Sequence, residues 1–180
     1  MRYLKTPIRF GYRQLKNLIK LLLGQPINYH PLGSQTLDLD DVKIAKYWLK
    51  QRNNWYDTEI IEEYEKEFAH WNGSKYAFAF MGGRVALSAA IYALDLKPGD
   101  EVILPGYTCV VVPNAFHYAG VKTVYSDIEL DTYGLDASLI EGKITPNTRA
   151  VLLHHLYGLV CRDYEQIIEV ARHHGLSIIE

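Results

Sequence analysis

The chain has 180 residues, of which 48% are hydrophobic and 22% charged, a composition that excludes a disordered tail, a collagen-like repeat and a highly charged filament. Its 19 basic and 21 acidic side chains leave a formal net charge of −2, so there is no overall positive field of the kind that holds nucleic acid. Cys109 and Cys161 show no CxxC spacing and are too few for a disulfide framework. We therefore expect a reducing, cytoplasmic environment, no structural metal and no nucleic-acid partner.

The first 24 residues carry six basic side chains and no acidic one. Leucine and isoleucine recur there at helical spacing, which predicts a basic amphipathic helix. Its longest apolar run, Leu21 to Leu23, is far short of the ~20 residues that span a bilayer. Three interpretations stay open: a helix packed on its own domain or on a partner subunit, which we favour, a weak membrane-surface contact by residues 1–24, or an organellar targeting peptide.

Residues 25–37 contain two prolines and a glycine without apolar periodicity, and this pattern predicts a linker. We accordingly divide the chain into residues 1–37, a basic helix with its linker, and a domain formed by residues 38–180. An amphipathic helix from Asp57 to about Asn72 leads into this domain.

Strand and helix patterns then alternate along the chain. Residues 75–81 predict a buried strand, Gly82-Gly83 a tight turn, and the residues from Arg84 a helix that is apolar nearly all round and therefore buried. The later predicted elements are a strand at 101–106, a helix at 110–118, a strand at 121–128, a short helix at 136–140, a strand from Thr148, a helix at 163–174 capped by Asp163, and the start of a strand at 177–180.

Strands separated by helices predict a three-layer α/β domain with a mostly parallel sheet and helices on both faces. A parallel strand that opens at Ile178 and meets a charged terminus two residues later would leave the sheet unfinished. We therefore expect the domain to be truncated at Glu180.

In such a sheet, ligands bind beyond the carboxyl ends of the strands, near helix N-termini whose free N–H groups attract anions. The Gly82-Gly83-Arg84 turn offers close backbone approach, unpaired N–H groups and a guanidinium, which together suit a phosphate. A tight turn beside a surface arginine explains these residues equally well. A dinucleotide site is disfavoured because the GxGxxG pattern is absent.

Two further loops follow predicted strands on the same edge. Tyr107, Thr108 and Cys109 could wall a flat ring, and the 154–158 loop offers His154, His155 and Tyr157 for hydrogen bonds to a ligand. Because alternate strand residues face opposite sides, one histidine must point away, and a satisfied core histidine remains the alternative. No carboxylate pattern accompanies these histidines, so we expect no metal.

Taken in order, these motifs resemble the sugar aminotransferases of the DegT/StrS type, enzymes of fold type I that use pyridoxal 5′-phosphate (PLP). The motifs are GGRVAL, KPGDEVILP, YTC, YAG, YSDIELDTYGLD, ITPNTRAV, HLYG and IIE. The resemblance runs from about Tyr64 to Glu180 and corresponds to the front half of a family member.

The resemblance implies roles for particular residues. Gly83 and Arg84 match the family's Gly-Thr pair, whose backbone amides hold the cofactor phosphate, and Gly82 stands where the family usually has serine. Cys109 matches the aromatic residue that stacks on the pyridine ring, so Tyr107 is a substitute candidate for that stacking. A second set matches the family's His-Leu-Tyr-Gly loop at the active-site edge: His155 and Tyr157 as substrate-binding residues, with Leu159 in place of a polar residue.

The family's pyridinium-binding aspartate and its Schiff-base lysine correspond to positions after Glu180, so we expect no catalytic residue within this span and no turnover by it alone. The intact parent would move an amino group from an amino-acid donor, such as glutamate, to a nucleotide-linked keto-sugar, and would form a homodimer. Two alternatives remain open: a non-catalytic remnant or interaction protein on the same fold, and a PLP-dependent sugar dehydratase.

Overall fold

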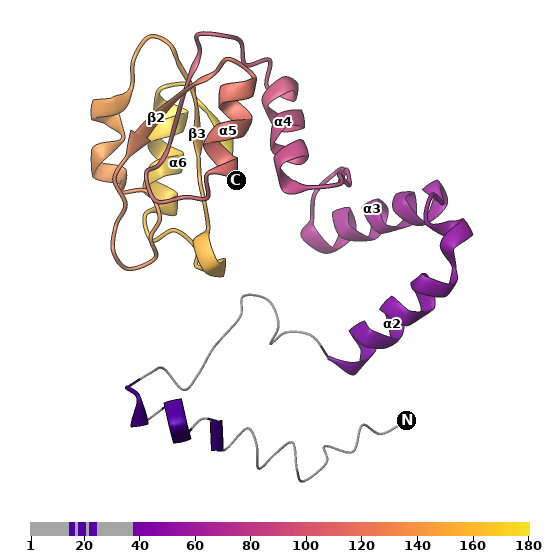
Figure 1. Ribbon diagram of the computed structural model, residues 1–180. Coiled ribbons are helices and arrows are strands. Elements are labelled where there is room, and N and C mark those ends of the chain that lie inside the picture. The colour runs from indigo at the N-terminus through magenta and orange to yellow at the C-terminus, as the bar shows by residue number, and fades with distance from the viewer. Residues whose placement is uncertain (1–14, 17, 21, 25–37) are drawn as a thin grey trace. The chain divides into compact units, whose positions relative to one another are not determined.

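The computed structural model describes residues 15–16, 18–20, 22–24 and 38–180 (Figure 1). Contacts divide the chain into two units, Met1–Ile60 and Ile61–Glu180, and each is described by itself. In the first unit, the described residues of the predicted basic helix are helical at 15–16, 18–20 and 22, and their leucines are exposed. Residues 1–14 and the predicted linker at 25–37 lie outside the described residues.

The first unit continues with helix α2 (Leu39–Lys50) and the short 3₁₀ helix η1 (Arg52–Asn54). A capping box begins α2: the Asp38 carboxylate accepts from the N–H of Asp41 at 3.2 Å, and the Asp41 carboxylate accepts from the N–H of Asp38 at 2.8 Å. Both bonds satisfy donors that a helix start leaves without partners, which explains why the helix begins here.

Helix α3 (Thr58–Asn72) matches its prediction, and Gly73 ends it in the left-handed region at φ +70°. The predicted buried strand at 75–81 is wrong. These residues form no strand, and Tyr76, Phe78 and Met81 are exposed. An alternating sequence becomes a strand only where a neighbour accepts its backbone hydrogen bonds, and none of the four described strands pairs with this segment.

The second unit is built on a four-stranded parallel sheet in the order β2-β1-β3-β4. The strands are β1 (Glu101–Pro105), β2 (Lys122–Ser126), β3 (Thr148–Leu152) and β4 (Ser177–Ile179). The central strand β1 is buried along its whole length, whereas β2 at the edge is only partly buried. The predicted parallel α/β fold is thus confirmed.

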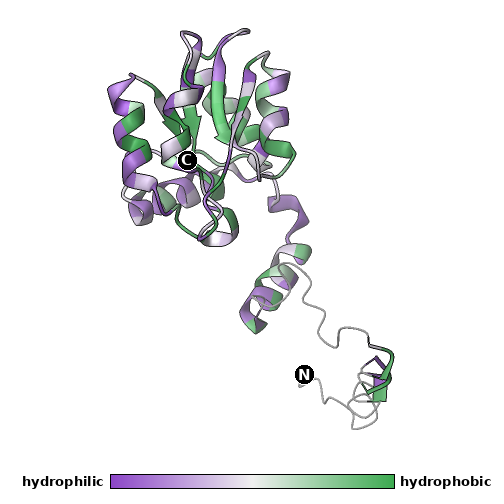
Figure 2. Ribbon diagram, turned by 90° about the vertical axis from the view of Figure 1, so that its left-hand side faces the viewer, coloured by the Kyte–Doolittle hydropathy of each residue, from purple (hydrophilic) through white to green (hydrophobic). Residues whose placement is uncertain are grey.

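Helices cover both faces of this sheet (Figures 1 and 2). Helices α4 (Gly83–Ala93) and α5 (Val111–Tyr118) pack together on one face, over Val102 and Leu104 of β1. Helix α6 (Tyr164–His173) and the 3₁₀ turn η2 (Ala137–Leu139) contribute to the core of the other face, and the exposed 3₁₀ turn η3 (Glu141–Lys143) follows η2. Two apolar cores on either side of β1 and β3 therefore produce the three layers.

Helix α4 is less buried than predicted. Ile91 is fully buried and Leu87 packs against the same core, but Val85 and Tyr92 are exposed. Only one face of the helix meets the sheet and α5, so its apolar composition does not translate into burial all round.

The amino edge of the sheet is held by a buried carboxylate. Glu101 accepts from Lys122 Nζ at 2.7 Å and from Thr145 Oγ1 at 2.5 Å. The hydrogen bonds from Lys122 and Thr145 outweigh the cost of burial and lower the pKa of Glu101. This edge is occupied by structural interactions, which leaves the opposite, carboxyl rim for ligands.

Candidate functional site

The carboxyl rim of the sheet collects the sequence-predicted site residues. The C-terminal end of α4 leads through residues 94–100 into the amino end of β1, so the first turn of α4 lies at the other end, level with the carboxyl rim (Figure 1). The loops after β1, β2 and β3 leave the sheet at this same rim because all the strands are parallel. The Gly82 turn therefore shares a rim with the loops that carry Tyr107 and His155.

The turn at the start of α4 has unpaired donors and open space. Gly82, Gly83 and Arg84 are exposed, and the backbone N–H groups of Gly83 and Arg84 donate to no atom of the described residues. Nothing lies within 4 Å of where a Cβ on Gly82 or Gly83 would stand. Free N–H groups at the positive end of an 11-residue helix, with a guanidinium beside them, form a donor set that fits a phosphate.

Tyrosines from three rim loops meet. The hydroxyl groups of Tyr107 and Tyr157 lie 3.2 Å apart, and this hydrogen bond raises the pKa of Tyr107. The ring of Tyr133, from the loop after β2, lies 5.8 Å from that of Tyr107 and 6.4 Å from that of Tyr157. The sequence motifs pointed to Tyr107 and Tyr157, but not to Tyr133.

Thr108 and His154 connect the first and third rim loops. Thr108 Oγ1 and His154 Nδ1 are 2.8 Å apart, and burial together with the neighbouring His155 lowers the pKa of His154. This imidazole is therefore neutral near pH 7. Cys109, one residue further on, is exposed.

His155 points to the other face of the sheet, as alternation along the chain requires. Its Nδ1 accepts from the N–H of Cys161 at 3.1 Å, so Nε2 holds the proton of the neutral ring and donates to Glu180 Oε1 at 2.8 Å. Protein atoms thus engage both ring nitrogens. This geometry fixes the loop that carries Tyr157.

A buried carboxylate organises the loop that carries Tyr133. Glu129 is 3% exposed and accepts from the hydroxyl and N–H of Thr132 and from the N–H groups of Asp131 and Gly134. Burial alone would raise its pKa, but these hydrogen bonds outweigh burial and hold the pKa of Glu129 at about 2. The sequence motifs did not point to Glu129 as an anchor, although an acidic residue a few positions before Thr-Tyr-Gly was an available signal.

Arg162 closes this loop from the α6 side, and the predicted capping role of Asp163 is wrong. The guanidinium donates to Asp131 Oδ2 at 2.9 Å and to Asp163 Oδ1 at 2.7 Å, and lies 3.8 Å from Glu129. The Asp163 side chain also accepts from the N–H of Ala137, and it makes no capping bond to α6. The Asp163 carboxylate therefore binds Arg162 and the backbone at Ala137, and not the first turn of α6.

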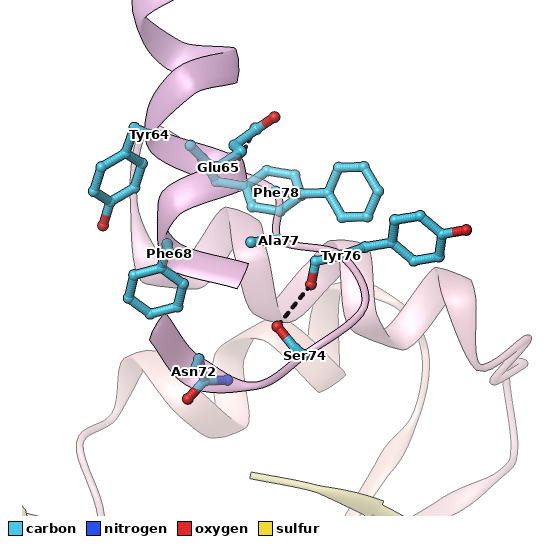
Figure 3. Close-up of a pocket in the computed structure, with 10 residues that line it drawn as sticks. Tyr64, Glu65, Phe68, Asn72, Ser74, Tyr76, Ala77 and Phe78 are labelled. Carbon is cyan, nitrogen blue, oxygen red and sulfur yellow. Dashed lines mark hydrogen bonds between the residues drawn. The ribbon is translucent and has the colours of Figure 1, made fainter. Parts of the chain in front are cut away.

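A separate groove of about 450 Å³ lies between α3 and residues 74–80 (Figure 3). Tyr64 and Phe68 of α3 line it, and Glu65 accepts from the N–H of Ala79 at 2.7 Å. None of the sequence-predicted site residues lines this groove.

Solved structures of PLP enzymes share this fold. An aminotransferase from Psychrobacter cryohalolentis matches with a TM-score of 0.73 and 29% sequence identity, over 84% of this chain and 38% of that one. The E. coli GDP-4-keto-6-deoxy-D-mannose-3-dehydratase, solved with hydrated PLP, matches with a TM-score of 0.71 and 26% identity, over 83% and 40% of the two chains. The fold is thus that of the PLP-dependent aminotransferases.

The family model that matches residues 40–180 is the DegT/DnrJ/EryC1/StrS aminotransferase family, and the chain belongs to this family. It is 44% identical over 121 residues to the GDP-perosamine synthase of Caulobacter vibrioides, which covers 67% of this chain and 32% of that protein. It is 40% identical over 120 residues to the UDP-2-acetamido-2-deoxy-3-oxo-D-glucuronate aminotransferase of Pseudomonas aeruginosa, over 67% and 33%. The chain therefore spans about a third of the length of these curated relatives.

Within the part of the chain that the structure describes, no helix has the length and apolarity needed to cross a membrane. Across the same residues, no cluster of three histidine, cysteine or acidic side chains is arranged to hold a metal ion.

Proposed function

We propose that this chain supplies the phosphate-binding part of a PLP-dependent aminotransferase that moves an amino group from an amino-acid donor, glutamate, to a nucleotide-linked keto-sugar. Family membership and the names of the relatives support the reaction type. The observation that carries the proposal is the open first turn of α4 at the carboxyl rim, with free amides at Gly83 and Arg84. A cytoplasmic location and a homodimer belong to the same proposal.

The cofactor phosphate would lie on the N–H groups of Gly83 and Arg84, with Gly82 leaving room for it and the Arg84 guanidinium neutralising its charge. Bound there, PLP would supply an electron sink for bond cleavage at the carbon that carries the amino group. Tyr107 and Cys109 belong to the loop that would face the ring, and Tyr157 would face the substrate. We assign His155 to the substrate loop as a residue that holds Tyr157 in place, because its ring nitrogens are engaged by Cys161 and Glu180.

No turnover is expected from residues 1–180 alone. Covalent attachment to PLP needs a lysine at the carboxyl rim. Lys97 pairs with Asp95 and Lys122 with Glu101, and both lie near the amino edge of the sheet. Lys75 lies over the ring of Tyr76. We therefore propose that the chain binds the phosphate of PLP without transferring an amino group by itself.

The test is the affinity of the full chain for PLP in the variants Arg84→Gln and Arg172→Gln. Arg172, in the last turn of α6, is an exposed arginine away from the rim and is the matched control. Because hydrogen bonds to charged groups are roughly twice as strong as neutral ones, we expect R84Q to raise the Kd for PLP about tenfold and R172Q to change it less than twofold. Inorganic phosphate should compete with PLP, and equal losses in the two variants would contradict the assignment.

A sugar dehydratase is the second candidate, because a PLP-containing dehydratase shares this fold at a TM-score of 0.71. Transfer of ¹⁵N from labelled glutamate to a keto-sugar by the enzyme that contains this chain decides between the two reactions. An aminotransferase delivers the label to the sugar, whereas a dehydratase releases water and leaves the sugar unlabelled.

A further inference from the structure

We propose that Tyr133 is a substrate-contacting residue, and that its ring, with those of Tyr107 and Tyr157, forms an aromatic wall for the hexose of the nucleotide-linked sugar. This inference rests on the proposed function and adds to it a substrate-contacting residue, Tyr133, and the part of the substrate that this residue contacts, the hexose. We call Tyr107, Tyr133 and Tyr157 the tyrosine wall.

Three separate loops build the tyrosine wall. Tyr107 follows β1, Tyr133 follows β2 and Tyr157 follows β3, and neighbouring ring centroids lie 5.8 and 6.4 Å apart. The side chains nevertheless stay open to solvent, with residue exposures of 49%, 39% and 68% respectively. Convergent aromatic rings that remain accessible at the ligand-binding rim form a surface on which a ligand can pack.

The backbone is held in an unfavourable conformation to present these rings. Tyr133 has φ +61° and Tyr157 has φ +59°, and only one other non-glycine residue of the described ranges, Asp95, has a positive φ. A left-handed conformation is unfavourable for non-glycine residues and persists where surrounding contacts impose it. The Glu129 hydrogen bonds impose it on the Tyr133 loop, and the His155 bonds fix the loop of Tyr157.

The negative charge near the tyrosine wall favours the hexose over the diphosphate of the substrate as the part that lies against the wall. Beside the wall, Glu129, Asp131 and Asp163 share the single guanidinium of Arg162, so this cluster keeps a net negative charge. A diphosphate would be repelled, whereas a hexose is uncharged at its ring. The C–H groups of a sugar ring pack well on the electron-rich face of an aromatic ring, which is the role assigned to Tyr133, and the paired phenol hydroxyls of Tyr107 and Tyr157 add hydrogen bonds to the sugar hydroxyls.

The experiment measures binding of GDP-α-D-mannose and of GDP alone to the full chain by saturation-transfer difference NMR. Three relatives are named GDP-perosamine synthases, which motivates the guanine nucleotide as the probe. The variant Tyr133→Asn removes the ring while keeping a residue type that tolerates positive φ, and Tyr133→Phe keeps the ring. Tyr118→Asn, at an exposed position in the last turn of α5, is the matched control.

The inference requires saturation transfer to the hexose protons in the unaltered chain. It further requires Y133N to raise the Kd for GDP-mannose about five- to tenfold, and Y133F and Y118N to change it less than twofold. The Kd for GDP alone should change less than twofold in all variants. Thermal unfolding of each variant verifies that it is folded.

Absence of hexose saturation, an unchanged Kd in folded Y133N, or an equal loss of affinity for GDP alone overturns the inference. PLP titrations of the same samples separate this result from the proposed function. If Y133N leaves sugar binding unchanged while R84Q still weakens PLP binding, the tyrosine wall fails and the cofactor assignment stands. If PLP does not bind at Gly83 and Arg84 while Y133N weakens sugar binding, the cofactor assignment fails and the tyrosine wall stands.

Discussion

Glu129 anchors the loop after β2 at the carboxyl rim. It is almost completely buried, and its carboxylate accepts four hydrogen bonds from Thr132 and from the N–H groups of Asp131 and Gly134. A buried carboxylate is tolerated only when such donors replace water. The acid thereby fixes the turn that projects Tyr133.

The variant Glu129→Gln should therefore destabilise the fold by about 2–3 kcal/mol at pH 7, because the amide loses charge-assisted hydrogen bonds and adds buried donors. The native pKa of Glu129, about 2, is below its ordinary value of 4.5. Its ionised form thus stabilises the native state above pH 4.5, and this contribution disappears as the pH falls toward 2. Urea unfolding at several pH values should show the difference between E129Q and the unaltered chain shrinking over this window.

The control for this measurement is Glu169→Gln, an exposed position on α6. Its stability should follow that of the unaltered chain within about 0.5 kcal/mol at every pH. A constant difference between E129Q and the unaltered chain from pH 7 to pH 2 would show that the carboxylate is not ionised in the native loop.

At the scale of elements, the loop after β2 and the segment before α6 are packed too closely for any side chain at Gly134. A Cβ there would stand 2.4 Å from Cys161 Sγ and 2.8 Å from Cys161 Cβ. Gly134→Ala should therefore cost about 1–3 kcal/mol of stability, whereas Gly142→Ala, with nothing within 4 Å, should cost far less. Equal urea midpoints for G134A and G142A would contradict the close packing of these two segments.

The sequence predicted the elements whose apolar pattern and end signals are both local. The strand and helix patterns from Glu101 to Ile179 match the structure within a few residues, because each buried strand carries its own apolar run and each helix its own breaker. Residues 75–81 carry the same alternating pattern but pair with no described strand. Apolar periodicity indicates that a segment is able to form a strand, but it carries no information about the neighbouring strand with which the segment would pair.

The same distinction applies to the site. Gly82, Gly83 and Arg84 were predicted to bind phosphate because a turn at a helix start is a local pattern. The structure places this turn level with the carboxyl rim, and phosphate binding there stays a prediction. Tyr133 was missed because its role depends on contacts across three loops. Glu129 was missed although its donors lie within five residues along the chain, because an acidic residue before a turn is usually exposed. Asp163 was misassigned because the nearby Arg162 guanidinium competes for its carboxylate, a contact that no capping pattern can anticipate.

At the scale of the whole molecule, the two edges of the sheet in the second unit have different roles, structural at the amino edge and ligand-binding in our proposal at the carboxyl rim. The amino edge is closed by the buried Glu101 and its partners, and the carboxyl rim holds the free amides of α4 and the tyrosine wall. The chain spans about a third of the length of its curated relatives. Amino-group transfer is therefore proposed for the enzyme that contains this chain. Phosphate binding can be tested directly on the chain itself.

The most direct test follows the backbone amide resonances of the ¹⁵N-labelled full chain during titration with PLP, inorganic phosphate and pyridoxal. We predict that the amides of Gly83 and Arg84 shift with PLP and with phosphate, and that pyridoxal, which lacks the phosphate, leaves them in place. Shifts confined to the N-termini of α5 and α6, or PLP binding that leaves Gly83 and Arg84 unmoved, would contradict the account.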